Sequence, residues 1–337
     1  KKVASNIGIF VVYMKEHIFN IKSEKEFTEV TLSIFKHQFQ NNKVYRSFCD
    51  LLYIHPSDVK TIDEIPFLPI QFFKSRQVLS SLEPVEEVFT SSGTTGSITS
   101  KHFVTDIQLY KESYLQGFAH FYGSIEDYVV LALLPNYLER KGSSLIFMVN
   151  DLIAKTNNQE SGFFLNNLQE LTKKLIELDK KGQKVLLIGV SFALLDLVEI
   201  QKFNLKNTII METGGMKGRR KELVREELHQ ILQEGFGVAQ IHSEYGMTEL
   251  LSQAYSKGNG IFETPSWMKI LTRDTEDALT IQKTGKTGGI NMIDLANYNS
   301  CSFIATQDLG KVHNNGTFEI IGRFDDSDIR GCNLMVL

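Results

Sequence analysis

The amino-acid sequence predicts an α/β fold with a largely parallel sheet, followed by a smaller antiparallel β region. Between residues 129 and 242, short and continuously apolar segments alternate with amphipathic segments of helical length. This alternation is typical of β-α-β units around a parallel sheet. After about residue 251 the helical periodicity fades, and short strand-like segments follow, separated by Gly and Asn turns.

The first clear element is a helix that begins at a capping box. Ser23 is the predicted N-cap, Glu26 stands three residues later, and apolar residues at helical spacing continue to about Asn41. The I-P-F-L-P stretch at 65–69 excludes a helix there, because proline removes a backbone donor and restricts the residue before it. We expect an extended, partly buried connector at this point.

The later elements are predicted from their periodicity and define three regions. Strands are expected at 129–134, 185–190, 208–211 and 238–242, and helices at 145–153, 164–179, 192–201 and 219–233. Further strands are expected at 290–295, 302–305 and 317–321. We therefore predict a helical segment and connector at 1–80, an α/β nucleotide-binding core at 81–250, and a β-rich sub-domain at 251–337.

Composition and charge exclude several classes of protein. The 337 residues include 36 Lys and Arg against 40 Asp and Glu, and 36 − 40 gives a net charge of −4. Without a basic excess or a long like-charge block, we expect no nucleic-acid partner. The apolar run at 7–14 is too short to span a bilayer and lacks a cleavage site, so we expect neither a membrane span nor a signal peptide.

Cysteine and histidine usage points to a reducing compartment and to no structural metal. Three cysteines, Cys49, Cys301 and Cys332, are too few for a disulfide framework in a chain of this length. We therefore expect a cytoplasmic protein. The eight histidines show no metal-ligand spacing and there is no C-x-x-C, so no zinc site is predicted.

A glycine-rich segment at 90–97, T-S-S-G-T-T-G-S, is a candidate phosphate cradle. Glycine permits tight turns in which successive backbone N–H groups converge, and hydroxyl groups add further donors. Lys101 would add a positive charge, and His102 beside it either faces phosphate or is a satisfied, half-buried histidine. The segment is not a Walker loop. Taken alone, a polar surface loop explains it as well as a nucleotide site does.

A second candidate segment, E-Y-G-M-T-E at 244–249, follows a predicted parallel strand, where α/β folds bind ligands. Tyr245 could stack on a purine, Thr248 could bond a phosphate, and Glu249 could hold Mg²⁺. The structural alternatives are a packed aromatic residue for Tyr245 and a helix-start acid for Glu249. Further along, Asp308 could accept ribose hydroxyl groups, and Arg323 follows in G-R-F-D-D.

Five stretches in this order resemble the ANL superfamily of adenylate-forming enzymes. They are S-S-G-T-T-G-S, G-G-M at 214–216, E-Y-G-M-T-E, T-Q-D-L-G and G-R-F-D-D. Within that superfamily the sequence is most similar to LuxE-type acyl-protein synthetases, and phenylacetate-CoA ligases share the nucleotide motifs. The likeness rests on I-P-F-L-P-I-Q-F-F-K at 65–74, L-L-P-N-Y-L-E-R-K-G-S-S-L at 133–145 and D-I-R-G-C-N-L-M at 328–335, and extends from about residue 17 to 337.

This resemblance implies a large domain with parallel sheets, and it implies ATP and Mg²⁺ as cofactors. The sequence ends shortly after the motif where larger relatives have a hinge, at Asp325, so we expect the C-terminal lid domain to be absent. Lys101 stands two positions later than the basic residue of the superfamily. By motif position, the resemblance implies that the ATP phosphates are held by Ser91, Ser92, Gly93, Thr94, Thr95 and Gly96, with Lys101 nearby. Gly214 and Gly215 would border the adenine and acyl pocket, and Tyr245 would flank adenine. Thr248 would contact phosphate, Glu249 would hold Mg²⁺, and Asp308 would bind the ribose with the help of Arg323.

The resemblance implies ATP-dependent activation of a carboxylic acid, a fatty acid in this family, followed by acyl transfer to a thiol. LuxE-type enzymes are similar in having a cysteine near this end that accepts the acyl group, which would make Cys332 an acyl relay. From residue type alone, Cys332 is a small apolar residue in a strand at 332–337. A neighbouring Arg330 would favour the thiolate.

Three alternatives stay open at this point. The acceptor could instead be a partner, either an acyl or acyl-CoA reductase or a carrier protein. The chain could be an acyl- or aryl-CoA ligase, or a non-catalytic scaffold that binds nucleotide or acyl ligand. For the acid pocket we expect aromatic and apolar side chains, including Phe103, Tyr137 and Met247.

Overall fold

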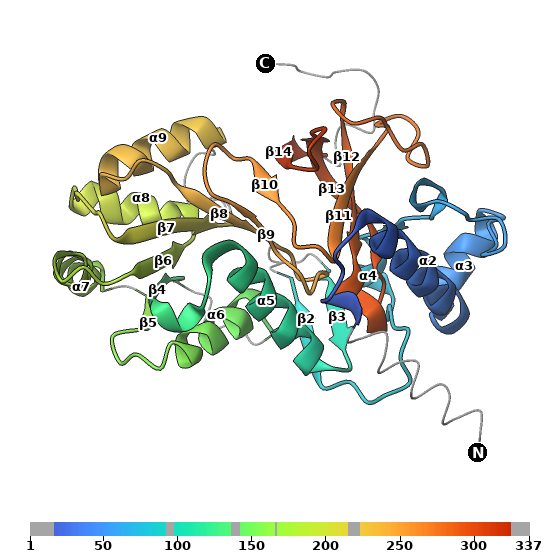
Figure 1. Ribbon diagram of the computed structural model, residues 1–337, viewed down its shortest axis with the longest axis horizontal. Coiled ribbons are helices and arrows are strands. Elements are labelled where there is room, and N and C mark those ends of the chain that lie inside the picture. Colours follow the sequence, from blue (N-terminus) through green and yellow to red (C-terminus); the bar gives the residue numbers. More distant parts are fainter. Residues whose placement is uncertain (1–16, 92–97, 136–141, 166, 215–222, 325–337) are drawn as a thin grey trace.

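A computed structural model of the chain describes residues 17–91, 98–135, 142–165, 167–214 and 223–324 (Figure 1). One twelve-stranded sheet runs through these residues, and a separate two-stranded hairpin lies beside it. The strand order in the large sheet is β11-β12-β13-β14-β10-β9-β8-β7-β6-β4-β5, with β1 added to β13. The predicted α/β class is confirmed.

One half of the large sheet is parallel and holds the predicted α/β core. Its strands are β4 (Val129–Leu133), β5 (Gly162–Phe164), β6 (Val185–Gly189), β7 (Thr208–Thr213) and β8 (His242–Tyr245). Every residue of β4 and β6 is buried, as expected for parallel strands that helices cover on both faces. Because the strands are parallel, their carboxyl ends meet at one edge of the sheet.

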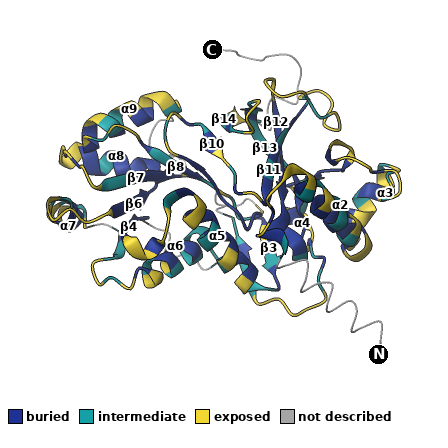
Figure 2. Cartoon of the chain, viewed as in Figure 1, coloured by how far each residue is buried: buried dark blue, intermediate teal, exposed yellow. Residues whose placement is uncertain are grey.

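Helices cover both faces of this half. They are α5 (Ile107–Tyr122), α6 (Ser144–Lys155), α7 (Leu168–Lys180), α8 (Ser191–Ile200) and α9 (Arg225–Phe236). In Figure 1, α8 and α9 lie on one face of the sheet, and α5 and α6 lie on the other. Each helix turns its apolar side toward the strands, so the dark blue of buried residues in Figure 2 follows the sheet while yellow marks the outer helix faces.

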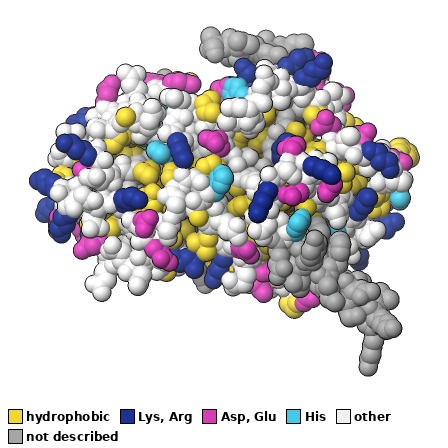
Figure 3. Space-filling model, viewed as in Figure 1, with side chains coloured by type: hydrophobic (Ala, Val, Ile, Leu, Met, Phe, Trp, Pro, Cys, Tyr) yellow, Lys and Arg dark blue, Asp and Glu magenta, His cyan; other side chains and the backbone are white. Residues whose placement is uncertain are grey.

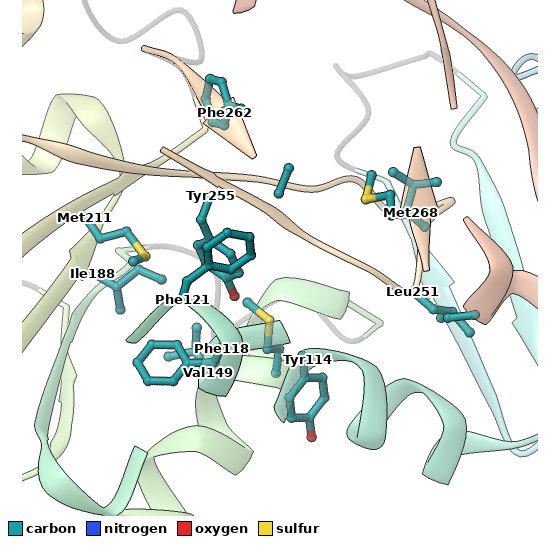
Figure 4. Close-up of a cluster of buried hydrophobic side chains, with 14 of the residues drawn as sticks. Tyr114, Phe118, Phe121, Val149, Ile188, Met211, Leu251, Tyr255, Phe262 and Met268 are labelled. Carbon is teal, nitrogen blue, oxygen red and sulfur yellow. The ribbon is translucent and has the colours of Figure 1, made fainter. Parts of the chain in front are cut away.

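The core is continuous between α5 and the sheet. In Figure 4, Phe121 of α5 lies beside Tyr255 of β9 (Ala254–Ser256). The rings of Phe121 and Tyr255 lie 5.3 Å apart. Apolar burial at this contact therefore holds α5 against the strands that end at the candidate site.

Three predicted elements begin later than the periodicity indicated. The predicted helix at 164–179 begins only at Leu168, after Asn167 caps it, because the preceding residues pair with β4 as the short edge strand β5. The predicted helix at 219–233 begins at Arg225, and its residues 219–222 lie outside the described residues. The predicted strand at 238–242 overlaps β8 only at His242, where the pairing with β7 begins.

The other half of the large sheet is antiparallel, as predicted. Its strands are β9 (Ala254–Ser256), β10 (Phe262–Glu263), β11 (Met268–Arg273), β12 (Thr287–Asp294), β13 (Phe303–Val312) and β14 (Phe318–Arg323), with the 3₁₀ helix η3 (Leu295–Asn299) after β12. The two halves share hydrogen bonds, because β9 pairs antiparallel with β8. The limits proposed for three domains stay a prediction.

The N-terminal part packs onto the antiparallel half. It contains α2 (Glu24–Asn41), α3 (Lys43–Leu51), η1 (Ile62–Glu64), β1 (Leu68–Pro69) and α4 (Phe72–Ser75). The hairpin of β2 (Glu87–Thr90) and β3 (Lys101–Val104) follows it, and the short η2 (Ile125–Asp127) precedes β4. Ser23 accepts a bond from the Glu26 N–H, as predicted, while the Glu26 carboxylate accepts from the Lys22 N–H. The predicted extended connector is confirmed, because β1 pairs with β13.

The described helices include none that is long and apolar enough to cross a membrane. On the face shown in Figure 3, Lys and Arg side chains are mixed with Asp and Glu side chains. This mixture is consistent with the small net charge of the sequence.

Candidate active site

The candidate site begins at the carboxyl ends of β7 and β8, which lie side by side in the sheet. Tyr245 is the last residue of β8, and Thr213 of β7 pairs with the residue before it. Gly214 follows β7 with a left-handed φ of 68°, which glycine adopts without strain. The Ser191 hydroxyl donates to the Gly214 carbonyl at 2.7 Å and fixes it there. Gly215 lies outside the described residues.

The β2–β3 hairpin forms the stem of the predicted phosphate loop. The Ser91 N–H donates to the Ser100 carbonyl at 3.1 Å, and the Ser100 N–H donates to the Ser91 hydroxyl at 2.9 Å. Two bonds therefore close the stem directly at the ends of the loop. The loop itself, Ser92, Gly93, Thr94, Thr95 and Gly96, lies outside the described residues.

This stem contacts the 244–249 segment. His102 of β3 is buried, and its Nδ1 lies 3.0 Å from the Thr248 carbonyl. Burial lowers the His102 pKa to about 4, so the ring is neutral near pH 7. Since a carbonyl only accepts, Nδ1–H donates to it, and Nε2 accepts from the Ser300 hydroxyl at 2.8 Å. The structure thus brings the stem of the predicted phosphate loop into contact with the 244–249 segment.

Glu249 lies at the same junction. Burial raises the pKa of its carboxyl group, and this effect is opposed by a hydrogen bond from the Ser100 side chain and by the charges of Arg323 and Lys74. In the described part of the chain, no group of three or more His, Cys, Asp or Glu side chains is arranged so that it could hold a metal ion. A single carboxylate still fits Mg²⁺, which proteins commonly bind through one or two carboxylates together with substrate phosphates.

Tyr245, Asp308 and Arg323 form a second group at this edge. The Tyr245 hydroxyl donates to Asp308 Oδ2 at 2.5 Å, and Arg323 Nε lies 3.6 Å from Asp308 Oδ1. Asp308 and Arg323 face each other as a pair across β13 and β14. The Tyr245 ring packs edge-on against Phe262 and Phe318, at 5.8 and 6.0 Å. Half-buried Tyr245 is therefore rigidly placed, and its predicted contact with adenine stays a prediction.

Lys101 lies on the opposite face of β3 from His102. Side chains alternate along a strand, and in β3 Lys101 is exposed while His102 is buried. Its predicted role in holding phosphate stays a prediction. Cys332, with Tyr137 and Asp325, lies outside the described residues. Cys49 and Cys301 are both buried.

Two residues at the site were not singled out from the sequence. Glu244 is buried and accepts a 2.5 Å hydrogen bond from the Thr213 hydroxyl, and burial raises its pKa to about 7. Lys74, whose charge acts to lower the pKa of Glu249, ends the I-P-F-L-P-I-Q-F-F-K stretch. Glu244 stands directly before Tyr245, and Lys74 ends the stretch at 65–74, so both positions were visible in the sequence. Neither position shows which side chains the fold brings together.

A cavity in the described part of the structure lies away from this site. It has a volume of about 320 Å³ and lies between the connector at 52–67 and residues 278–281, with Asn291 on its wall. None of the predicted site residues lines it. The chemistry proposed from the sequence does not involve this cavity.

Comparison with protein families supplies the deciding observation. A model of the family described as "Acyl-protein synthetase, LuxE" matches residues 11–117 and 151–337, which is most of the chain. The chain belongs to the LuxE acyl-protein synthetase family. The matched ranges include both the phosphate-loop segment and the 244–249 segment.

Curated relatives of this LuxE-family chain carry one name. A long-chain-fatty-acid–luciferin-component ligase of Vibrio harveyi is 23% identical over 344 residues, covering 94% of this chain and 88% of the relative. The protein of the same name from Photorhabdus luminescens is 34% identical over 76 residues, covering 22% of this chain and 65% of the relative. The first likeness extends over nearly the whole chain, and the second is local.

Solved structures share the fold of the LuxE-family chain. A 2-hydroxyisobutyryl-CoA ligase in the postadenylation state matches with a TM-score of 0.65 at 11% identity, covering 92% of this chain and 70% of that one. ATP-bound MatB from Rhodopseudomonas palustris matches with a TM-score of 0.54 at 17% identity, covering 72% of this chain. The chain spans 49% of MatB, about half its length. These likenesses confirm the ANL-type fold.

Proposed function

We propose that this LuxE-family chain uses ATP to activate a long-chain fatty acid as an acyl-adenylate and then transfers the acyl group to a protein thiol. The observation that supports this best is the contact between the stem of the phosphate loop and the 244–249 segment, through His102 and Thr248. The family and the names of the curated relatives support the fatty acid and the protein acceptor.

In the first step a carboxylate oxygen of the acid attacks the α-phosphorus of ATP. The bond from that phosphorus to the bridging oxygen breaks, and pyrophosphate leaves. The protein contributes positioning and charge neutralisation. Ser91 to Gly96 would hold the phosphates, and Tyr245 would flank adenine. Gly214 and Gly215 would border the adenine and acyl pocket, and Asp308 would accept the ribose hydroxyl groups.

Glu249 would hold Mg²⁺ at this site, with the substrate phosphates as the other ligands. When bound, Mg²⁺ neutralises charge on the polyphosphate. The chain's own part is to keep the backbone next to Glu249 at the loop stem, which the bond from His102 to the Thr248 carbonyl does. Thr248 would bond a phosphate oxygen.

In the second step a thiolate attacks the acyl carbonyl carbon, AMP leaves, and a thioester forms. The thiol proton goes to solvent. We propose Cys332 as the first acceptor and a partner protein, such as an acyl reductase or carrier protein, as the next. A free thiol requires a reducing compartment, so we place the protein in the cytoplasm.

The test of the first step is fatty-acid-dependent exchange of labelled pyrophosphate into ATP. A panel of straight-chain acids of increasing length would be compared with short and aromatic acids. We expect exchange that depends on the acid and is strongest for long chains. No exchange with any acid would contradict adenylation and favour the non-catalytic scaffold.

The test of the second step is retention of a labelled acyl group on the denatured protein. We expect the label to remain in the wild type, to be released by hydroxylamine, and to be lost in Cys332→Ala. Cys49→Ala is the matched control, because burial raises the Cys49 pKa to about 12 and leaves no thiolate near pH 7. Label that instead appears in a CoA thioester would identify a CoA ligase.

A further inference from the structure

The guanidinium group of Arg273 is buried in the antiparallel half of the sheet. Arg273 ends β11 and is 8% exposed. Its Nη1 donates to the Ile290 carbonyl and to Asn291 Oδ1 of β12, each at 2.8 Å, and its Nη2 donates to the Thr306 carbonyl of β13 at 2.5 Å. One side chain therefore links three neighbouring strands (Figure 1). The proposed function assigns no role to it.

This reach across β12 depends on a glycine. Gly289 stands opposite Arg273 in the sheet, and the arginine side chain passes it to bond to β13. A Cβ atom at position 289 would lie 2.6 Å from Arg273 Cζ and 2.9 Å from its Nε, closer than Cβ atoms come to their neighbours. The far end of an arginine side chain is flexible, so a larger residue at 289 would displace the guanidinium group and leave the strands in place. Gly289 thus provides the space that this group occupies.

The guanidinium group holds β13 at a bulge that ends at Asp308. Residues 306–308 of β13 stand between two regular pairs, opposite the single residue Ile290 of β12. Such a bulge redirects the side chains of its strand. Besides the bond from Arg273 to its carbonyl, Thr306 donates its hydroxyl to the Ile290 carbonyl at 3.0 Å, and this hydroxyl accepts from the Asp308 N–H at 3.1 Å. The backbone of Asp308 is therefore fixed through Thr306.

The same group contacts the end of β14, the strand that carries Arg323. Arg273 Cζ lies 5.6 Å from the centre of the Phe324 ring, and the Phe324 N–H donates to the Gln307 carbonyl in the bulge at 2.7 Å. Arg323, one residue earlier, faces Asp308 across the two strands. Burial lowers the Arg273 pKa to about 10, and the charge of Asp308 opposes this effect. Arg273 is thus charged near pH 7 and contacts both strands that carry the Asp308–Arg323 pair.

We propose that Arg273 is a positioning residue for nucleotide recognition, which fixes the bulge of β13 so that the Asp308 carboxylate meets the ribose hydroxyl groups. The Tyr245 hydroxyl occupies one acceptor site of Asp308, and a carboxylate has further lone pairs for a ligand. An acceptor that is already held in place loses less freedom when the ligand binds. The structural alternative is an arginine that stabilises the sheet alone. The inference rests on the proposed function, since it needs a nucleotide beside Asp308.

The experiment compares the affinities of AMP and 2′-deoxy-AMP, because the second nucleotide lacks one ribose hydroxyl group. Calorimetric titrations would use the full chain as wild type, Arg273→Met and Gly289→Ala. We expect the wild type to prefer AMP by about 10- to 100-fold, the range for a charge-assisted hydrogen bond. In Arg273→Met the preference should fall below about threefold, mainly through weaker AMP binding, because the bulge no longer holds Asp308 in place. Gly289→Ala should lower it by at least about threefold, because its Cβ displaces the guanidinium group.

A matched control separates positioning from a general loss of stability. Leu175→Ala removes a fully buried side chain from α7 in the parallel half, so it destabilises the protein but should keep the wild-type preference for AMP. Gly289→Ala keeps the Arg273 side chain, so it tests the inference even where Arg273→Met does not fold. An unchanged preference in either folded variant would overturn the inference, and so would an equal loss in Leu175→Ala. If the wild type binds neither nucleotide, the proposed function fails; if it binds both equally, or if the variants keep its preference, only the inference fails.

Discussion

At the scale of single residues, two neighbouring buried carboxylates differ in their partners. Glu212 of β7 has a cation, because Arg225 Nη1 lies 2.8 Å from its Oε1. Among the described residues, Glu244 of β8 has the Thr213 hydroxyl as its hydrogen-bond partner, and the charge of Glu212 nearby adds to the effect of burial in raising its pKa. A buried carboxyl group without a cation takes up a proton more readily than it does in water. Glu244 is therefore a titrating group inside the site.

We predict that Glu244 lowers stability as the pH rises from about 4.5 to about 7. Its pKa is raised from 4.5 in the unfolded chain to about 7 in the folded protein, so the folded state binds more protons in this interval. Where the folded state binds more protons, the free energy of unfolding falls with rising pH. The total effect is roughly 3 kcal/mol, at about 1.4 kcal/mol for each pKa unit.

The measurement is urea unfolding of the wild type and Glu244→Gln at several pH values between 4 and 8. The glutamine keeps an acceptor for Thr213 and has no proton to lose. We expect the stability difference between variant and wild type to grow in favour of the variant as the pH rises. Parallel curves for the two proteins would show that Glu244 does not titrate there.

At the scale of elements, the N-caps show how local signals acquire tertiary roles. Asn42 caps α3, with its Oδ1 accepting from the N–H groups of Val44 and Tyr45. Its Nδ2 also donates to Ser300, whose hydroxyl bonds to His102. Asn167 caps α7 in the same way but is exposed, and within the described residues its side chain bonds to Glu170 of the first turn of the same helix. The two caps thus differ in their contacts: Asn42 also bonds to a distant segment, whereas Asn167 bonds within its own helix.

We predict that Asn42→Ala destabilises the protein more than Asn167→Ala does. Loss of an exposed cap costs about 1 kcal/mol. Asn42 is 1% exposed and makes two further side-chain bonds, to Ser80 and to the Ser300 carbonyl, so its loss should cost about 3 kcal/mol. Chemical denaturation of the two variants measures both values. Equal costs would mean that the tertiary bonds of Asn42 add nothing to its cap.

At the scale of the whole molecule, the parallel and antiparallel halves form one hydrogen-bonded sheet. The joint is the pairing of β8 with β9, where Ser243 faces Ser256 and Tyr245 faces Ala254. Asp294, at the end of β12, accepts bonds from the N–H groups of Leu251 and Ser252. A chain cut at residue 250 would lose these bonds and expose two strand edges, which are unfavourable when left unpaired.

We predict that the described halves unfold together. Trp267, the single tryptophan of the sequence, is 4% exposed in the antiparallel half, and its Nε1 donates to Ser252 at 2.9 Å. Its fluorescence reports on that half, while far-UV circular dichroism is dominated by the helices around the parallel half. In urea the two signals should give the same midpoint. Two separate midpoints would support a domain limit near residue 250.

Some of this could be predicted from the sequence because the signals are local. The Ser23 cap, the buried apolar runs of β4 and β6, and the proline-containing connector each depend on a few neighbouring residues. The start of β8 was predicted too early because its apolar approach, 238–241, resembles a strand. Gly237 ends α9 in a left-handed conformation, and pairing with β7 begins only at His242.

The sequence by itself determined the α/β class, the order of the motifs, and through them the family to which the chain belongs. Only the tertiary structure decided which groups meet: His102 with the Thr248 carbonyl, Tyr245 with Asp308, and Thr213 with Glu244. Periodicity and caps are fixed by neighbours within a few residues. Contacts between distant segments depend instead on strand order and register, which no short stretch of sequence contains.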